Sequence, residues 1–196
     1  MEKRVQSESE NPVTDLDLGM ADDLGEDTLA YFRKCEEKLG LVPNVLKAYA
    51  FDEKKLRAFS EFYNDLMLAP SGLSKLDREM IAVVVSSLNH CHYCLTAHGA
   101  AVRELSGDAA LGDTLVMNYR AASLDRRQRA MLDFAVKLTE QPDRIEETDR
   151  QMLRACGFDN RDIWDIAAVA AFFNMSNRVA TATGMRPNHA YFSAGR

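Results

Sequence analysis

The chain has 196 residues, a length that fits one compact domain and is sufficient to bury an apolar core. Its formal net charge is −6, from 24 basic and 30 acidic residues. Residues 1–27 hold nine acidic and two basic side chains, so residues 28–196 are close to neutral. Because a neutral body lacks the basic face that neutralises phosphates, nucleic acid is excluded as an expected partner.

The sequence predicts a protein that stays in the cytoplasm. Its longest uninterrupted apolar run, residues 166–173, is far shorter than the roughly 20 residues that span a bilayer, and its N-terminus lacks the apolar centre of a secretory signal. The four cysteines are too few and too unevenly placed for a disulfide framework; they are Cys35, Cys91, Cys94 and Cys156. In a reducing compartment the close pair indicates metal binding or catalysis instead.

Alanine and leucine are abundant, and no segment alternates between apolar and polar residues over a strand's length. This composition predicts an all-α protein. Residues 1–27 are expected to form an acidic arm without chemistry, and residues 28–196 a single domain with its core motif at 74–105. Helices are expected at 26–39, 44–50, 53–68, from Ser74 through the apolar run 81–85, and then at 91–105, 108–120, 125–140, 146–155 and 159–180.

The sequence also contains a short internal similarity. Sliding the chain by 85 residues places Asp77, Ile81 and Asn89 over Asp162, Ile166 and Asn174. The two halves could therefore be related helical hairpins, of which only the first keeps reactive side chains.

Two thiols and three of the four histidines lie between His90 and His98. On a helix at about 100° per residue, Cys91, Cys94 and His98 share one face, whereas His92 points elsewhere. If that helix begins near Cys91, the positive end of its dipole favours a thiolate there. The cluster is therefore a candidate nucleophilic site.

Glu79 joins this candidate site if the chain reverses at Asn89 and His90. In one straight helix Glu79 would lie about 18 Å from Cys91. In an antiparallel helical hairpin, Glu79 and His98 stand at the same depth, because one precedes the turn and the other follows it by similar lengths. The carboxylate would then orient His98, and His98 would take the proton of Cys94.

Several kinds of site remain compatible with these residues. Covalent haem attachment requires a histidine directly after the second cysteine, where this chain has Leu95, and a thioredoxin-type site requires a βαβ setting that this sequence lacks. A zinc site stays open, with Cys91, Cys94 and His98 as ligands and a fourth from Glu79, His90 or His92. A thiol peroxidase or disulfide-cycling site is the main hypothesis.

The spacing of Glu79, eleven residues, Cys91-x-x-Cys94, three residues and His98 resembles the alkylhydroperoxidase D (AhpD)-like branch of the carboxymuconolactone decarboxylase superfamily. Two further segments, 40–44 (Gly-Leu-Val-Pro-Asn) and 174–178 (Asn-Met-Ser-Asn-Arg), resemble its peroxidase-related members. The resemblance covers residues 28 to the C-terminus.

The resemblance implies an all-α fold that assembles as trimers or hexamers, without a bound cofactor or metal. It implies that Cys94 is the peroxidatic thiol, Cys91 the resolving thiol, and Glu79 with His98 the proton relay. A dithiol or lipoyl-bearing protein would supply the reducing equivalents. The best-known members have a histidine just before the second cysteine, where this chain has Tyr93. Superfamily decarboxylases that act on a lactone acid lack the cysteine pair.

Two alternative functions use the same side chains. One is a non-enzymatic zinc-binding or redox-sensing helical module, and the other is a superfamily enzyme that acts on an unknown small molecule. Other notable residues are interpreted structurally: Cys35, Cys156 and Trp164 as core or helix-end residues, Asn174, Asn177 and Arg178 as helix-end or subunit-contact residues, and His189 as solvated.

Overall fold

The computed structural model describes residues 12–196, and every regular element in that part of the chain is a helix. The predicted all-α class is therefore confirmed. In chain order the α-helices are α1 (Glu26–Leu39), α2 (Asn44–Tyr49), α3 (Glu53–Leu68), α4 (Lys75–Leu88), α5 (His92–Ser106), α6 (Ala109–Asn118), α7 (Arg126–Glu140), α8 (Glu147–Ala155) and α9 (Asn160–Ala182). Three short 3-10 turns are η2 (Tyr119–Ala121), η3 (Pro142–Arg144) and η4 (His189–Phe192).

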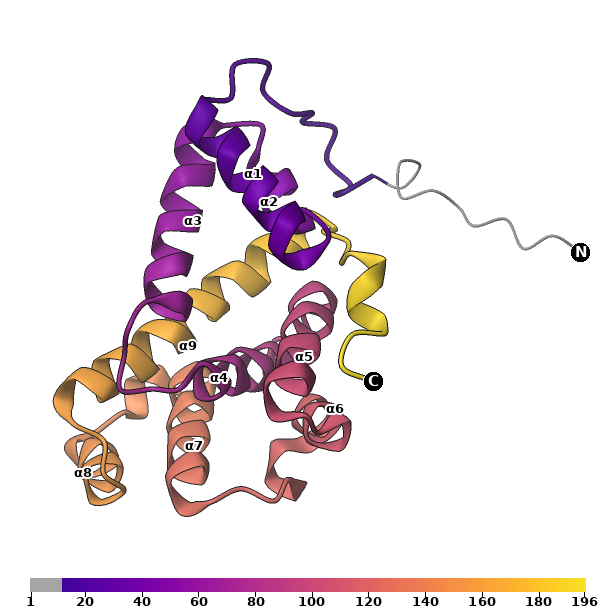
Figure 1. Ribbon diagram of the computed structural model, residues 1–196. Helices are drawn as coiled ribbons and strands as arrows, with labels where there is room; N and C mark the ends of the chain where they lie inside the picture. Colours follow the sequence, from indigo (N-terminus) through magenta and orange to yellow (C-terminus); the bar gives the residue numbers. More distant parts are fainter. Residues whose placement is uncertain (1–11) are drawn as a thin grey trace, which may run out of the picture.

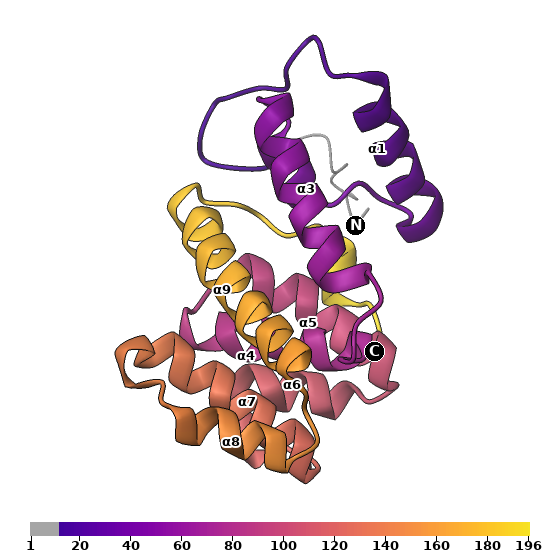
Figure 2. The same cartoon turned by 90° about the vertical axis from the view of Figure 1, so that its left-hand side faces the viewer.

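Helix α4 forms the centre of the molecule, and α5, α6, α7 and α9 pack around it (Figure 1). All residues from Asp77 to Ser86 are buried, as expected for a helix with neighbours on every side. Seen from the side, α9 crosses in front of α4 and α5, while α1 and α3 lie at the end away from α7 and α8 (Figure 2). The core is built by large apolar side chains from several of these helices, among them Leu56, Met80, Leu132, Ile166 and Phe173.

Residues 1–11 of the predicted acidic arm lie outside the described residues. From residue 12 the arm runs along the end of α9, because the Asp15 N–H donates to the Thr183 carbonyl at 2.8 Å. Arg186 donates its backbone N–H to the Val13 carbonyl at 2.9 Å, and its guanidinium also pairs with Asp15. The described part of the arm is thus tied to the C-terminal segment of its own chain.

The internal similarity is reflected in the helix starts. Ser74 and Asp77 form a capping box at the start of α4, and Asp159 and Asp162 form the same arrangement at the start of α9. The second copy does not turn back as a hairpin, however. α9 continues without a break to Ala182, beyond Asn174, the position that corresponds to the turn residue Asn89.

The sequence interpretation of Trp164 as a core residue is wrong, since its side chain is 56% exposed. The apolar run of α9 covers the whole circumference of the helix, and burial follows the helical period, so one face must point outward. Trp164 lies on that face with Ala171 and Met175, whereas Ile163 and Ile166 point into the core. Cys35 is buried and His189 is exposed, both as expected.

The two capping boxes give a matched test of this architecture. Ser74→Ala and Asp159→Ala should each lower the free energy of unfolding by about 1 kcal/mol, because each removes the acceptor for a first-turn N–H. Urea unfolding of both variants measures the loss. A change below about 0.3 kcal/mol in both would show that these caps do not stabilise the starts of α4 and α9.

Candidate active site

The chain reverses between α4 and α5 at Asn89 and His90, as predicted. His90 has a φ of 52°, in the left-handed region, where histidine is found more often than most side chains. The Cys91 N–H then donates to the Ser86 carbonyl at 3.1 Å, which closes the turn. Cys91 is therefore the residue that caps the N-terminus of α5.

The hairpin brings Glu79 and His98 into direct contact, and this predicted pairing is confirmed. His98 Nδ1 lies 2.6 Å from Glu79 Oε2, with both side chains 11% exposed. Because a carboxylate only accepts, Nδ1 carries the proton and Nε2 remains free for proton exchange. The imidazole packs edge-on against Phe173, with ring centroids 4.6 Å apart, and near Tyr63. The roles of Glu79 and His98 in a reaction stay predictions.

The two cysteines lie together in a small cluster of their own. Each is 1% exposed, and both pack with Tyr93, Ala180 and Met185. The pKa of the Cys91 thiol is lowered to about 6, first because the Cys94 thiol donates a hydrogen bond to it. Burial opposes this, whereas the Cys94 backbone N–H at the start of α5, Thr181 and His98 add to the lowering. These contacts favour deprotonation of Cys91 over deprotonation of Cys94.

The pKa of Cys94 is raised well above its ordinary value, first because its thiol donates to Cys91 and second because of burial. Hydrogen bonds from Asn177 and Ser176 of α9 act in the opposite direction. The two sulfurs thus have different sets of donors: the start of α5 and Thr181 favour charge on Cys91, and Asn177 and Ser176 favour charge on Cys94.

Two neighbouring residues of the motif have structural roles. The Tyr93 hydroxyl accepts the Val45 backbone N–H at 2.9 Å, so the residue that departs from the best-known relatives ties α5 to the start of α2. His92 is exposed and lies near Phe192 of η4, with ring centroids 6.0 Å apart. The structure thus pairs Glu79 with His98 and packs Cys91 against Cys94, with His98 close enough for its charge to act on Cys91. His92 lies outside the site.

Comparison with known proteins finds chains that are similar to this one over almost their whole length. A peroxidase-related protein from Silicibacter sp. TM1040 is 64% identical over 95% of this chain and 97% of its own, with a TM-score of 0.92. The chain belongs to the AhpD-like, peroxidase-related branch of the carboxymuconolactone decarboxylase family. The model of the carboxymuconolactone decarboxylase family matches residues 53–110, which span α3, α4, α5 and the start of α6.

Two other solved structures are also similar to this AhpD-like chain, one of them at low sequence identity. A peroxidase-related protein from Ralstonia eutropha JMP134, described as an alkylhydroperoxidase AhpD core, is 40% identical over 95% of this chain and 98% of its own, with a TM-score of 0.91. The debrominase Bmp8 shares the fold at 18% identity, with a TM-score of 0.74 over 93% of this chain and 95% of its own. No curated protein sequence matches the chain significantly.

The AhpD-like site does not provide the ligand set of the zinc alternative. Among residues 12–196, no three His, Cys, Asp or Glu side chains converge in a way that could hold a metal ion. His98 directs Nδ1 to Glu79, and Cys94 donates to Cys91. The same part of the chain has no helix that is long and apolar enough to cross a membrane.

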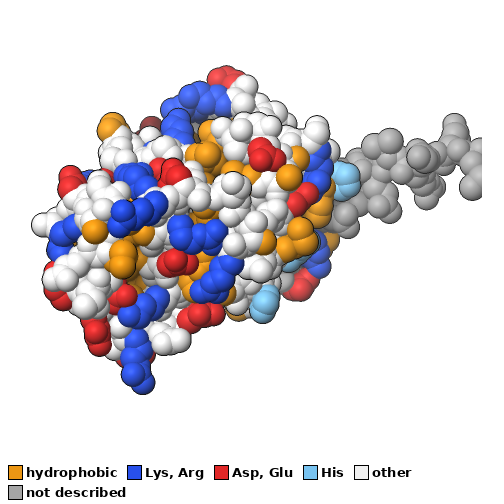
Figure 3. Space-filling view, turned by 90° about the horizontal axis from the view of Figure 1, so that it is seen from below, with side chains coloured by type: hydrophobic (Ala, Val, Ile, Leu, Met, Phe, Trp, Pro, Cys, Tyr) orange, Lys and Arg blue, Asp and Glu red, His pale blue; other side chains and the backbone are white. Residues whose placement is uncertain are grey.

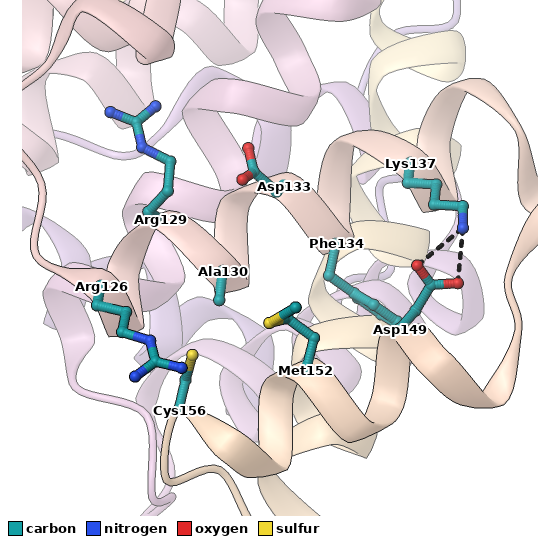
Figure 4. A pocket seen from close by; sticks show the side chains of 9 residues that line it. All are labelled: Arg126, Arg129, Ala130, Asp133, Phe134, Lys137, Asp149, Met152 and Cys156. Atoms are coloured by element: carbon teal, nitrogen blue, oxygen red, sulfur yellow. Dashed lines mark hydrogen bonds and ion pairs between the residues drawn. The ribbon is translucent and has the colours of Figure 1, made fainter.

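A pocket of about 350 Å³ lies away from this site, between α7 and α8 (Figure 4). Four of its five charged residues have internal partners: Lys137 binds Asp149 at 2.7 Å, Asp133 accepts from Tyr119, and Arg129 donates to three backbone carbonyls. Basic and acidic side chains are likewise interspersed over the molecular face seen from below (Figure 3). Cys156 lines this pocket, far in the fold from the cysteine pair.

The sequence interpretation missed the contribution of α9. Asn177 is 1% exposed, so it is buried within the protomer, and it lowers the pKa of the Cys94 thiol. The interpretation of Asn177 as a helix-end or subunit-contact residue is therefore wrong. Asn174 likewise bonds within the chain, to Asn89 and Thr139. The available signal was three polar residues, Asn174, Ser176 and Asn177, directly after the apolar run 166–173 of the same predicted helix.

The lowered pKa of Cys91 can be tested directly. Its alkylation by iodoacetamide, followed peptide by peptide by mass spectrometry, should reach half its maximal rate near pH 6. Below that pH the rate should fall about tenfold per pH unit, because the thiolate is the nucleophile.

Cys94→Ala should move this midpoint upward, because the main donor to the Cys91 thiolate is lost. Cys156→Ala removes a distant thiol and serves as the control. A Cys91 midpoint above pH 8 in the unmodified protein would contradict the assigned charge distribution.

Proposed function

We propose that the protein is a thiol-dependent peroxidase that reduces hydroperoxides through Cys91 and Cys94, with Glu79 and His98 as its proton relay. The observation that carries this proposal is the buried pair Cys91 and Cys94, packed in one cluster, together with a histidine held by a carboxylate. Such a site holds a sulfur nucleophile, a base for its proton and a second thiol within bonding reach. Membership of the AhpD-like branch supports the same activity.

The first step forms a sulfenic acid on Cys94. The Cys91 thiolate accepts the hydrogen bond of the Cys94 thiol and is therefore aligned to take its proton. As that proton moves, the Cys94 sulfur attacks the terminal peroxide oxygen and the O–O bond breaks. The alkoxide leaves as an alcohol after taking a proton from His98, which holds the proton that Cys91 gave up when it became a thiolate and whose positive charge Glu79 stabilises.

The second step forms the disulfide. Cys91, once it has returned its proton to the relay, attacks the sulfur of the Cys94 sulfenic acid, and the hydroxyl leaves as water after protonation. The net change is the two-electron oxidation of two thiols to a disulfide and the reduction of one hydroperoxide to an alcohol and water. A dithiol must then reduce the disulfide by thiol–disulfide exchange, and a lipoyl-bearing protein is the partner that the family resemblance favours.

We also propose that the protein works as a homo-oligomer, a trimer or hexamer, in the reducing cytoplasm. The exposed apolar face of α9 supports self-association, because Trp164 and Met175 are large apolar side chains that a second copy could cover. A reducing compartment would keep the resting pair as thiols, the form in which the cycle begins.

Turnover separates the roles of the two cysteines. With tert-butyl hydroperoxide and excess dihydrolipoamide, Cys94→Ser should abolish catalysis. Cys91→Ser should allow one slow oxidation and then stop at the Cys94 sulfenic acid, which dimedone traps. Cys156→Ser should turn over at the rate of the unmodified protein. Trapping of a sulfenic acid on Cys91 in the Cys94→Ser variant, at an undiminished rate, would reverse the two roles.

Glu79→Gln tests the relay. The amide oxygen can still accept from His98 Nδ1, so the imidazole keeps its orientation, but the charge that stabilises the imidazolium is lost. Turnover should fall at least about tenfold while the circular dichroism spectrum is unchanged.

Glu104→Gln, on the exposed face of α5, is the matched control for removing a carboxylate. Equal turnover in the Glu79→Gln variant, its control and the unmodified protein would exclude Glu79 from the relay. Absence of peroxide turnover in all of them would instead favour the alternative of a superfamily enzyme acting on another small molecule.

A further inference from the structure

The cysteine pair is closed off from solvent, because Cys91 and Cys94 are each 1% exposed. A reactant that is to meet either sulfur must therefore pass the side chains that cover them. The side chains packed with the pair are those of Val45, Ala48, Tyr93, Ala97, Ala180 and Met185. Four of these six belong to α2 or to the end of α9 and the segment after it.

A pocket of about 190 Å³ lies between α2, the described part of the arm and the segment after α9, which is yellow in Figure 1. We call it the C-terminal pocket. It is smaller than the roughly 300–1,000 Å³ of sites for drug-sized ligands, so it fits a small molecule or one end of a longer one. Its lining includes Val13, Asn44, Lys47, Arg186, Asn188 and Phe192.

The C-terminal pocket lies on the outer side of the layer that covers the pair. On α2, Asn44 lines the pocket, and the next residue, Val45, packs with the pair. Lys47 likewise lines the pocket directly before a covering residue. After α9, Arg186 lines the pocket, and the residue before it, Met185, packs with the pair. Because consecutive Cα atoms are 3.8 Å apart, one layer of chain separates the pocket from the pair.

Hydrogen bonds hold the backbone of this layer in place. The Asn44 N–H donates to Asn188 Oδ1 at 2.7 Å, and Asn44 Nδ2 donates to the Arg186 carbonyl at 2.9 Å. The Val45 N–H donates to the Tyr93 hydroxyl at 2.9 Å. These bonds tie α2 both to the segment after α9 and to α5. A route through the layer must therefore open by movement of a side chain.

Met185 is the flexible side chain of the layer. It is unbranched and rotates about three bonds, whereas Val45 is branched and stiff at its first bond. Tyr93 is held at its hydroxyl, and the remaining covering residues are alanines. Met185 is 7% exposed, so it fills the space between pocket and pair in the closed state. Its rotation opens that space without breaking the hydrogen bonds of the frame.

The C-terminal pocket favours a negatively charged ligand. Among the described residues no Asp or Glu side chain lines it, whereas Lys47 and Arg186 do. Arg186 is paired with Asp15, but within residues 12–196 no ion pair involves Lys47. The Lys47 ammonium is thus available to an anion, and Val13 and Phe192 add apolar wall. The lining fits a molecule that has an apolar part and one carboxylate.

We propose that the C-terminal pocket is the entrance to the cysteine pair for an organic hydroperoxide that carries a carboxylate. Lys47 binds the carboxylate, and Met185 is the gate past which the peroxide end reaches the sulfurs. This deepens the proposed function by naming a class of substrate, and it rests on that function only in identifying the reactant as a hydroperoxide. Neither Lys47 nor Met185 takes part in proton or electron transfer.

Two thiol reagents of nearly equal size test the charge preference in the full reduced chain. Iodoacetate is an anion and iodoacetamide is neutral, so the ratio of their alkylation rates at Cys91 and Cys94 is independent of the thiolate fraction. Lys47→Gln should lower the iodoacetate rate at least about threefold and leave the iodoacetamide rate unchanged. Added salt should reduce the same ratio in the unmodified protein. Cys156, in the other pocket, is the internal control whose ratio should stay constant.

The entrance and the gate are tested with the same reagents. Val13→Trp fills the C-terminal pocket from the arm and should slow both reagents, whereas Thr14→Trp, at the next position and outside the lining, is the matched control. Met185→Ala shortens the gate and should speed both reagents, with Met152→Ala in the other pocket as its control. Thermal unfolding monitors each fold. Val13 lies outside the helical elements, so Val13→Trp tests the entrance even if Met185→Ala does not fold.

Each part of the proposal has its own contrary result. An unchanged ratio of the two rates in Lys47→Gln would overturn the binding of an anion. Equal rates in Val13→Trp and Thr14→Trp would overturn the entrance, and unchanged rates in Met185→Ala would overturn the gate. Because alkylation needs no peroxide, these results stand whether or not the protein reduces hydroperoxides. The expected alkylation pattern without peroxide turnover would support the entrance and reject the proposed function.

Discussion

The reversal of the chain at Asn89 and His90 is the constraint on which the site depends. It pairs Glu79 with His98 across two antiparallel helices and places Cys91 at the N-cap position of α5, directly before its first residue. Both consequences depend on the same turn. Glu79 and His98 can meet only if they lie at equal distances from the turn, and a Cys91 thiolate is stabilised by the free backbone N–H groups at the start of α5. Burial of α4 on all sides then holds the turn in one conformation.

Around this hairpin, α9 supplies the groups that distinguish the two sulfurs. Thr181 favours charge on Cys91, while Ser176 and Asn177 favour charge on Cys94. A pair that shares one proton can place its charge on either sulfur at modest cost when each has its own donors. This suits a cycle in which one thiol must attack and the other must later displace a hydroxyl group. The buried position of both sulfurs strengthens each of these hydrogen bonds.

Much of the fold and the pairing of Glu79 with His98 followed from the sequence. Helix limits were readable because Gly40, Ser74 and Asp159 punctuate strongly periodic segments, and the hairpin followed from similar spacings before and after Asn89. Trp164 was misplaced because a helix that is apolar on every side does not reveal which face points outward. The role of Asn177 was not readable, since it depends on how α9 crosses the hairpin, a contact between residues about 90 positions apart.

The central claim is that Cys91 and Cys94 act as one redox unit on a hydroperoxide. Its most direct test is to add one equivalent of tert-butyl hydroperoxide per reduced chain and to map the thiols by mass spectrometry. The account predicts loss of two thiols per chain and one new crosslink, a Cys91–Cys94 disulfide, with Cys35 and Cys156 still reduced. Oxidation spread over all four cysteines, or a pair that stays reduced, would contradict it.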